Sequence, residues 1–275
     1  MRSRSGCGIG RNIMRLASKW ALTACLILTG AGSGALAASE TNIAAMDLSK
    51  PFATRAPWRF TARQGPDVED PGGNDAPGAI SLCLTRDNGK TCHSAPGKAL
   101  RLPSGDDSFA EPHYIDALKV VHPRPGAPLL LLQVASFHAG NGDQRAAMQL
   151  YAYDRSKDDF VLAYEHRTGR NNNQEIRFVE QGPLRGDIIS SEPTSDAPFG
   201  YWITVNRLSP TQKYEQILHF RSATTYGDGN PLAVIDSEMP NIHRRLGLWR
   251  SGMSLPLPAR ACPRPHLVNG ALWCS

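Results

Sequence analysis

Alternating apolar and polar positions dominate the middle of this chain, and they predict a β-sheet. Residues 129–135 are apolar at every position except Gln133, whereas residues 148–153 and 160–165 alternate as half-buried strands do. A strand without a polar face must be covered on both sides. We therefore expect residues 129–135 to lie centrally in a sheet or between layers.

Further strand patterns flank this segment, separated by turn formers such as Asn88-Gly89 and Gly182-Pro183. They cover residues 58–63, 79–86, 114–122, 175–180, 187–191, 201–208 and 214–226. About ten strands at such intervals predict an all-β, mainly antiparallel fold, either a sandwich or barrel-like. A propeller-like arrangement is the weaker alternative, because no signature recurs with a fixed period.

One short helix is predicted near the C-terminus, over residues 236–246. Asp236 or Ser237 offers a side-chain cap, Pro240 is tolerated in a first turn, and Gly247 provides a stop. The proline-rich tail, residues 250–275, is expected to wrap the surface.

The N-terminus has the charge and hydropathy pattern of a secretory signal peptide. An apolar run over residues 20–29 precedes Ala35-Leu36-Ala37, a small-residue cleavage pattern. Before this run the chain has no acid and five basic residues: Arg2, Arg4, Arg11, Arg15 and Lys19. We expect cleavage near Ala37 and a secreted or periplasmic protein, followed by a flexible arm (38–57) and a single β-rich domain (58–275).

Two alternatives concern this segment. Translation from Met14 would give a more compact signal, and both starts remain open. Leu22-Thr23-Ala24-Cys25 is similar to a lipoprotein cleavage box, but only about five residues separate Cys25 from Lys19, and the apolar run continues beyond the cysteine. Cleavage without lipidation is therefore favoured.

Removing the signal changes the charge of the chain. The whole sequence has 30 basic and 25 acidic residues, so losing the five basic residues leaves 25 of each. A formal net charge near zero gives no electrostatic reason to expect nucleic acid as a partner. No other apolar run approaches the roughly 18 residues of a spanning helix, so the mature chain is expected to lack a transmembrane segment.

Four cysteines remain after cleavage, and an even number in an exported chain predicts disulfides. The spacing favours two local bridges, Cys83 with Cys92 and Cys262 with Cys274. A zinc site is the alternative, but neither pair has the C-x₂₋₄-C spacing of zinc ligands.

The densest group of oxygen ligands follows the last predicted strand. Asp228 and Asn230, with Asp236 and Glu238, offer candidate calcium ligands. A glycine-rich turn followed by a helix start is the simpler interpretation, because the EF-hand spacing is not met. The acidic loop at 65–78 is a second, weaker calcium candidate. We expect no cofactor, with calcium as the possible exception.

A second polar group lies after the central strand, where His138 precedes Asn141 and Asp143. Strand ends often carry sites, and His138 has the chemistry of a base or a ligand. A histidine beside a turn more often bonds the backbone, so this remains a candidate. His219 sits between Leu218 and Phe220 and is expected to be exposed on the opposite face of its strand.

Basic residues and tryptophans supply the remaining candidates. Residues 239–275 contain no acid but five arginines, Arg244, Arg245, Arg250, Arg260 and Arg264, for which solvation or pairing with the acidic loop is favoured over a partner site. Tryptophans can stack on sugars, although core positions are commoner. Three are candidates: Trp202, Trp249 and Trp273.

Motifs that carry a catalytic mechanism are missing from the mature sequence, including G-x-S-x-G, S-x-x-K, H-E-x-x-H, Walker and G-x-G-x-x-G patterns. Their absence lowers the expectation of common hydrolases and nucleotide enzymes. We therefore expect a non-enzymatic domain that binds a ligand or partner of the cell envelope. The alternative is a secreted hydrolase with a dispersed, metal-assisted site or one using His138.

Overall fold

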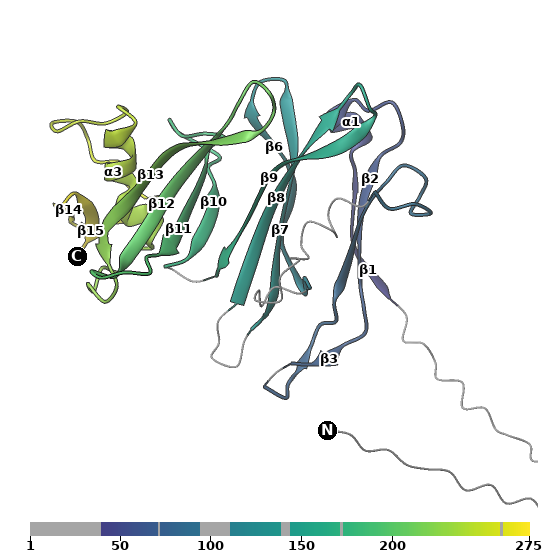
Figure 1. Cartoon of the computed structure of the whole chain (residues 1–275), viewed down its shortest axis with the longest axis horizontal. Coiled ribbons are helices and arrows are strands. Elements are labelled where there is room, and N and C mark those ends of the chain that lie inside the picture. Colours follow the sequence, from purple (N-terminus) through teal and green to yellow (C-terminus); the bar gives the residue numbers. More distant parts are fainter. Residues whose placement is uncertain (1–39, 71, 94–110, 139–143, 171–172, 259–260) are drawn as a thin grey trace, which may run out of the picture. The chain divides into compact units, whose positions relative to one another are not determined.

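Antiparallel pairing organises nearly all of the chain that the computed structural model describes, namely residues 40–70, 72–93, 111–138, 144–170, 173–258 and 261–275. These residues belong to the second of two units, residues 38–275. The prediction of a mainly antiparallel β fold with one short C-terminal helix is confirmed. Three sheets of three or four strands carry the structure (Figure 1).

The first sheet has the strand order β1-β2-β5 and corrects one expectation. Its strands are β1 (Thr41–Asp47), β2 (Arg59–Gln64) and β5 (Ile80–Thr85). Residues 38–57 were expected to form a flexible arm, but β1 pairs with β2 along its length, and α1 (Ser49–Phe52) buries Leu48 and Phe52 in the core. Most side chains of β1 are exposed, because β1 is an edge strand. Its sequence therefore lacks the alternation of apolar and polar residues that a half-buried strand shows.

Two short strands lie in the acidic loop between β2 and β5. They are β3 (Val68–Glu69) and β4 (Asp75–Ala76), which pair with each other. Asp70 closes the turn between them, because its carboxylate accepts bonds from the amides of Gly72 (2.8 Å) and Asn74 (2.9 Å). The loop is therefore held by bonds from its own backbone amides to the Asp70 side chain.

The second and third sheets are four-stranded meanders. The second contains β6 (Tyr114–Arg124), β7 (Ala127–His138), β8 (Gln144–Asp154) and β9 (Asp159–Gly169). The third contains β10 (Glu175–Phe178), β11 (Ile188–Pro193), β12 (Gly200–Leu208) and β13 (Tyr214–Thr225). Each strand pairs with the next along the chain, as the short predicted turns require.

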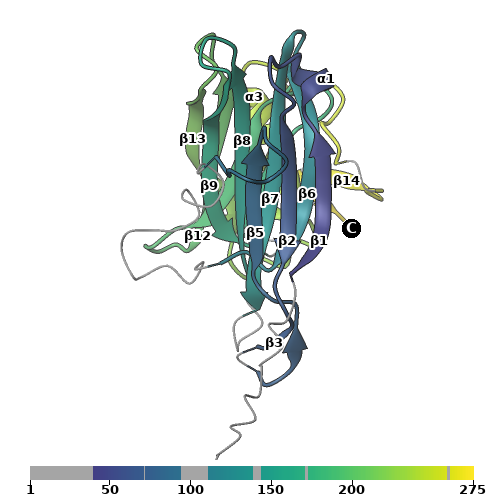
Figure 2. The ribbon, with the colours of Figure 1, turned by 90° about the vertical axis from the view of Figure 1, so that its right-hand side faces the viewer.

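Separate cores join these sheets into layers. Leu130 and Leu132 of β7 pack with Trp58 and Phe60 of the first sheet and its flanking loop, whereas Leu129 and Leu131 join a core that includes residues of the third sheet. Figure 2 shows the first sheet in front of the second. The apolar run of β7 is thus covered on both faces, as its sequence predicts.

The C-terminal helix, α3 (Val234–Arg245), packs on the other face of the third sheet. It begins two residues before the predicted start, with Ala233 as its N-cap and no side-chain cap, because Val234 and Ile235 are drawn into the third core. Pro240 therefore lies inside the helix instead of in its first turn. Gly247, with φ of 71°, follows the helix as predicted.

The tail contains a hairpin that the prediction of a surface wrap missed. Strands β14 (Pro265–Val268) and β15 (Ala271–Cys274) pair with each other, and Ala271 and Leu272 are buried. The turn residues Asn269 and Gly270 have φ of 51° and 88°, which suits the tight turn of a two-residue hairpin.

The two local cysteine pairs lie at disulfide distance. Cys83 pairs with Cys92 at a Cα separation of 5.0 Å, and Cys262 pairs with Cys274 at 5.1 Å. The first closes the loop after β5, and the second ties the start of the tail to the end of β15. Among the described residues no helix is both long and apolar enough to span a membrane.

Candidate functional site

The structure disperses the four proposed calcium ligands. Asp228 closes a turn, since its carboxylate accepts bonds from the amides of Asn230 (2.9 Å) and Thr225 (3.1 Å). The Asn230 amide group donates to the Ser237 hydroxyl at 2.8 Å. These contacts tie the side chains of Asp228 and Asn230 to different protein groups and do not bring them to a common metal position.

The two helix acids have separate partners. Asp236 forms an ion pair with Arg177 of β10, and buried Glu238 accepts bonds from the Thr224 amide (2.8 Å) and the Asn241 side chain (2.8 Å). In the described part of the chain, no three His, Cys, Asp or Glu side chains gather as a metal site would require. These acids therefore link α3 to the third sheet.

The second predicted group falls partly outside the described residues. Asn141 and Asp143 lie there, while the backbone of His138 pairs with Gln144 at the end of β7. His219 is exposed, as predicted, and its ring stacks on Trp202.

The basic C-terminal residues mostly contact the protein itself. Arg244 lies 5.3 Å from the Trp249 ring centre and Arg245 lies 4.5 Å from that of Phe220. The Arg264 guanidinium donates to the backbone oxygen of Ser275, whereas Arg260 is outside the described residues. No ion pair within the described residues joins these arginines to the acidic loop.

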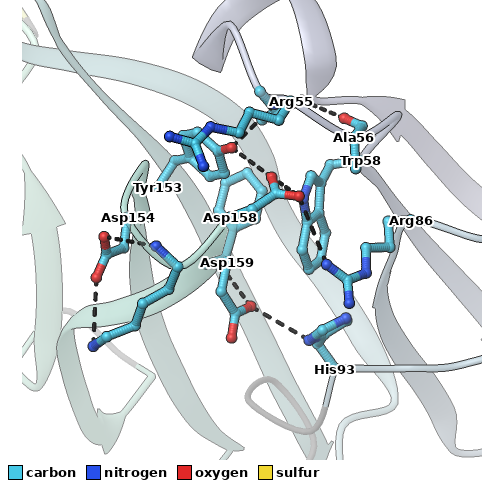
Figure 3. Close-up of polar contacts among 12 residues, drawn as sticks. Arg55, Ala56, Trp58, Arg86, His93, Tyr153, Asp154, Asp158 and Asp159 are labelled. Atoms are coloured by element: carbon cyan, nitrogen blue, oxygen red, sulfur yellow. Dashed lines mark hydrogen bonds and ion pairs between the residues drawn. The ribbon is translucent and has the colours of Figure 1, made fainter.

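A polar cluster that the sequence did not predict joins the first and second sheets (Figure 3). Asp158, in the β8–β9 turn, accepts bonds from the Tyr153 hydroxyl (2.5 Å) and the Trp58 indole (3.2 Å), and Arg86 lies 3.6 Å away. The Tyr153 hydroxyl bond is the main reason why the pKa of Asp158 is lowered. Next to it, His93 faces Asp159 at 3.3 Å.

This cluster fixes one wall of a cleft of about 420 Å³. We call it the four-turn cleft, because its lining comes from the single helical turn of α1 and from the three turns β6–β7, β8–β9 and β12–β13. The lining residues are 52, 126, 128, 153–156 and 210–213, together with Val161 of β9. Its volume falls in the range of small-molecule sites. Segments distant in the sequence therefore meet at one end of the sheets.

Two cations line the four-turn cleft without a carboxylate partner. The Arg155 guanidinium donates to the backbone oxygens of Ala53 (3.2 Å) and Phe52 (3.3 Å), and the Lys213 ammonium donates to that of Leu162. No acid lies within ion-pair distance of either cation in the described chain. Carbonyl oxygens hold these side chains in place but leave their positive charge unbalanced.

The one acid in the cleft is already engaged. Asp154 accepts bonds from the amide (2.9 Å) and hydroxyl (2.6 Å) of Ser156, and Lys157 lies 3.4 Å from its other oxygen. These bonds lower the pKa of Asp154, the Ser156 hydroxyl most strongly. The cleft is lined by two cations and one anion, so it favours a ligand with negative charge.

A larger hollow, of about 490 Å³, lies beside β1 and β6, but its charges are balanced. Asp116 and Arg170 both line it and pair with each other at 3.0 Å. Burial raises the pKa of Asp116, and the Arg170 charge opposes that shift. Uncommitted charge, and not volume, therefore distinguishes the four-turn cleft from this hollow.

Comparison of the chain with protein-family models, with curated proteins and with solved structures finds no match. The functional argument therefore rests on geometry. The predicted strands leave residues 154–159 and 209–213 as connections, and the available signal was a basic residue in each of them, Arg155 and Lys213. Nothing in the sequence indicated that these turns share a cleft.

Proposed function

We propose that this chain is an exported binding protein that holds a small anionic ligand in the four-turn cleft. The observation that carries the proposal is the pair Arg155 and Lys213, two cations facing one cleft with backbone carbonyls as their protein partners. Guanidinium and ammonium groups bind carboxylates and phosphates through charge-assisted bonds. A ligand of this class would balance both charges.

Export is the second part of the proposal. It rests on the signal-peptide pattern of residues 1–37 and on two cysteine pairs at disulfide distance, which suit an oxidising compartment. Cleavage near Ala37 and a cell-envelope ligand or partner remain part of this proposal. The alternative of a secreted hydrolase gains no support from residues 228–238, whose acids bind protein groups.

Calorimetric titration of the mature chain with inorganic phosphate and with succinate tests the proposal. We expect saturable binding of at least one, weakened at least tenfold in Arg155→Ala and weakened by added salt, since the contact is electrostatic. Arg185→Ala is the matched control, because exposed Arg185 also donates to a backbone oxygen, that of His122 (3.3 Å), but does not line the cleft. Binding of neither anion, or an equal loss in both variants, would refute the proposal.

A further inference from the structure

One face of the third sheet carries polar and aromatic side chains that the four-turn cleft does not use. In the strand register Glu192 is opposite Trp202, and Thr204 is opposite His219. Directly paired residues share a face, and residues two apart on a strand do so as well. These four side chains therefore lie on one face, the one that also carries Ile188 and packs toward the second sheet.

Three of these side chains, those of Trp202, Thr204 and His219, are in contact, and all four are at least partly exposed. The rings of Trp202 and His219 stack with centres 4.7 Å apart and planes 15° apart, and His219 Nδ1 lies 2.9 Å from the Thr204 hydroxyl. Glu192 forms an ion pair with His166 of β9. The side chain of Glu192 is 42% exposed, so a ligand can reach its carboxylate, whereas Nε2 of His166 is buried.

Buried hydroxyl groups on β9 flank His166. Register pairs Tyr164, His166 and Thr168 with Leu150, Met148 and Ala146, which places all three on one face of β9. That face is directed at the third sheet, because Met148 and Leu150 share a core with Ile188. The three side chains form what we call the β9 row.

The hydroxyls of Tyr164 and Thr168 are buried and have no hydrogen-bond partner among the described residues. Thr168 is only 7% exposed. Burial raises the pKa of Tyr164, and the charge of Glu192 raises it further, which places the hydroxyl near that carboxylate. Buried hydroxyls in folded proteins are nearly always bonded, so the hydroxyls of Tyr164 and Thr168 are open to a bond from a molecule that enters beside His166.

The chemistry of this surface differs from that of the four-turn cleft. The side chains of Glu192 and His166 are already paired with each other, so the surface offers no free cation for an anion. The surface offers hydroxyl and imidazole groups, which donate and accept bonds, and a carboxylate, which accepts them, beside a flat indole. A sugar ring matches it, because it presents hydroxyls at its rim and carbon-bound hydrogens on its face.

We propose that Glu192, Trp202, Thr204 and His219, together with the β9 row, form a second site that binds a neutral sugar residue. This site is independent of the anion site. It assigns to one ligand three features of the facing surfaces of the second and third sheets: the indole of Trp202, the partly exposed carboxylate of Glu192 and the unbonded hydroxyls of β9.

Tryptophan fluorescence tests this site, using chitobiose, cellobiose and maltose as probes. Of the four tryptophans after residue 37, Trp58 and Trp249 are buried, whereas Trp202 and Trp273 are partly exposed. We expect a saturable change in emission with at least one disaccharide. The change is lost in Trp202→Phe and kept in the matched control, Trp273→Phe.

His219→Ala provides a variant whose folding is not at risk, because His219 is exposed. Binding should weaken at least tenfold. If none of the three sugars gives a saturable change, if the two tryptophan variants respond alike, or if His219→Ala binds as tightly as the unmodified chain, the proposal is overturned. The same variants are titrated with inorganic phosphate, so that failure of the sugar site and failure of the anion site are read separately.

Discussion

Two neighbouring leucines test whether β7 is buried on both faces. Leu131 is 1% exposed in the core shared with the third sheet, and Leu132 is fully buried in the core shared with the first sheet. Replacing either with alanine removes about three carbon groups, or roughly 2.4 kcal/mol of transfer free energy at about 0.8 kcal/mol each. The unfilled space adds to this, so each variant should lose about 3 to 5 kcal/mol of stability.

Urea unfolding of Leu131→Ala and Leu132→Ala, with disulfides intact, measures both losses. The slope of free energy against urea should remain that of the unmodified chain, so that midpoints compare stability directly. Leu257→Ala is the control, since Leu257 is 52% exposed and its loss should be within about 0.5 kcal/mol. A loss under about 1 kcal/mol in either core variant would show that one face of β7 is not covered.

Four further predictions follow from single contacts. The pKa of Asp158 is lowered from 3.8, so the stability that its ionised form contributes is present above about pH 4 and is lost as the pH falls through the lowered value. In Asp158→Asn the free energy of unfolding should therefore depend less on pH in this range. An equal pH dependence in the variant and the unmodified chain would contradict this. Replacing Cys262 and Cys274 with serine opens a 12-residue loop and should cost about 3 kcal/mol in chemical unfolding; no change would contradict the bridge. Gly270→Ala should cost more than about 1 kcal/mol in thermal unfolding, because φ is 88° and the added carbon would lie 2.8 Å from Asn241; a neutral result would refute the hairpin contact. Calcium should leave the melting temperature unchanged, since the acids of residues 228–238 already bind protein groups; saturation at a hundredfold excess over the dissociation constant would instead add about 2.7 kcal/mol.

Periodicity predicted the strands whose burial leaves a mark in the sequence. The apolar run in β7 has no polar face, and this strand has a core on each side, as the neighbouring β8 also has. Local spacing was also sufficient for the cysteine pairs, because each closes a short loop. In both cases the determining interaction is encoded within a few residues.

The missed elements depend on partners elsewhere in the chain. Strand β1 is held by its ladder with β2, and its own residues are largely exposed. The dipeptide Asn269-Gly270 is typical of a hairpin turn, but the many prolines around it favoured an irregular tail over strands. Helix α3 starts at Val234 because burial in the third core outweighs a side-chain cap, an effect that capping rules do not contain.

Neither candidate site could be predicted from the sequence. Arg155 and Lys213 are far apart in the sequence, and they share a cleft because the second and third sheets place their turns at the same end. His166 and Glu192 likewise meet only across two sheets. Both candidate sites arise from the way in which the sheets are layered, and short-range sequence patterns do not specify that layering.

Layered sheets bring turns that are distant in the sequence into one anion site, and backbone amide shifts on titration with inorganic phosphate show whether these turns bind one ligand together. We expect the amides of the turns at residues 126–128, 153–156 and 210–213 to shift together with a single dissociation constant. Shifts confined to one of these turns, or scattered over other surfaces with different constants, would contradict it.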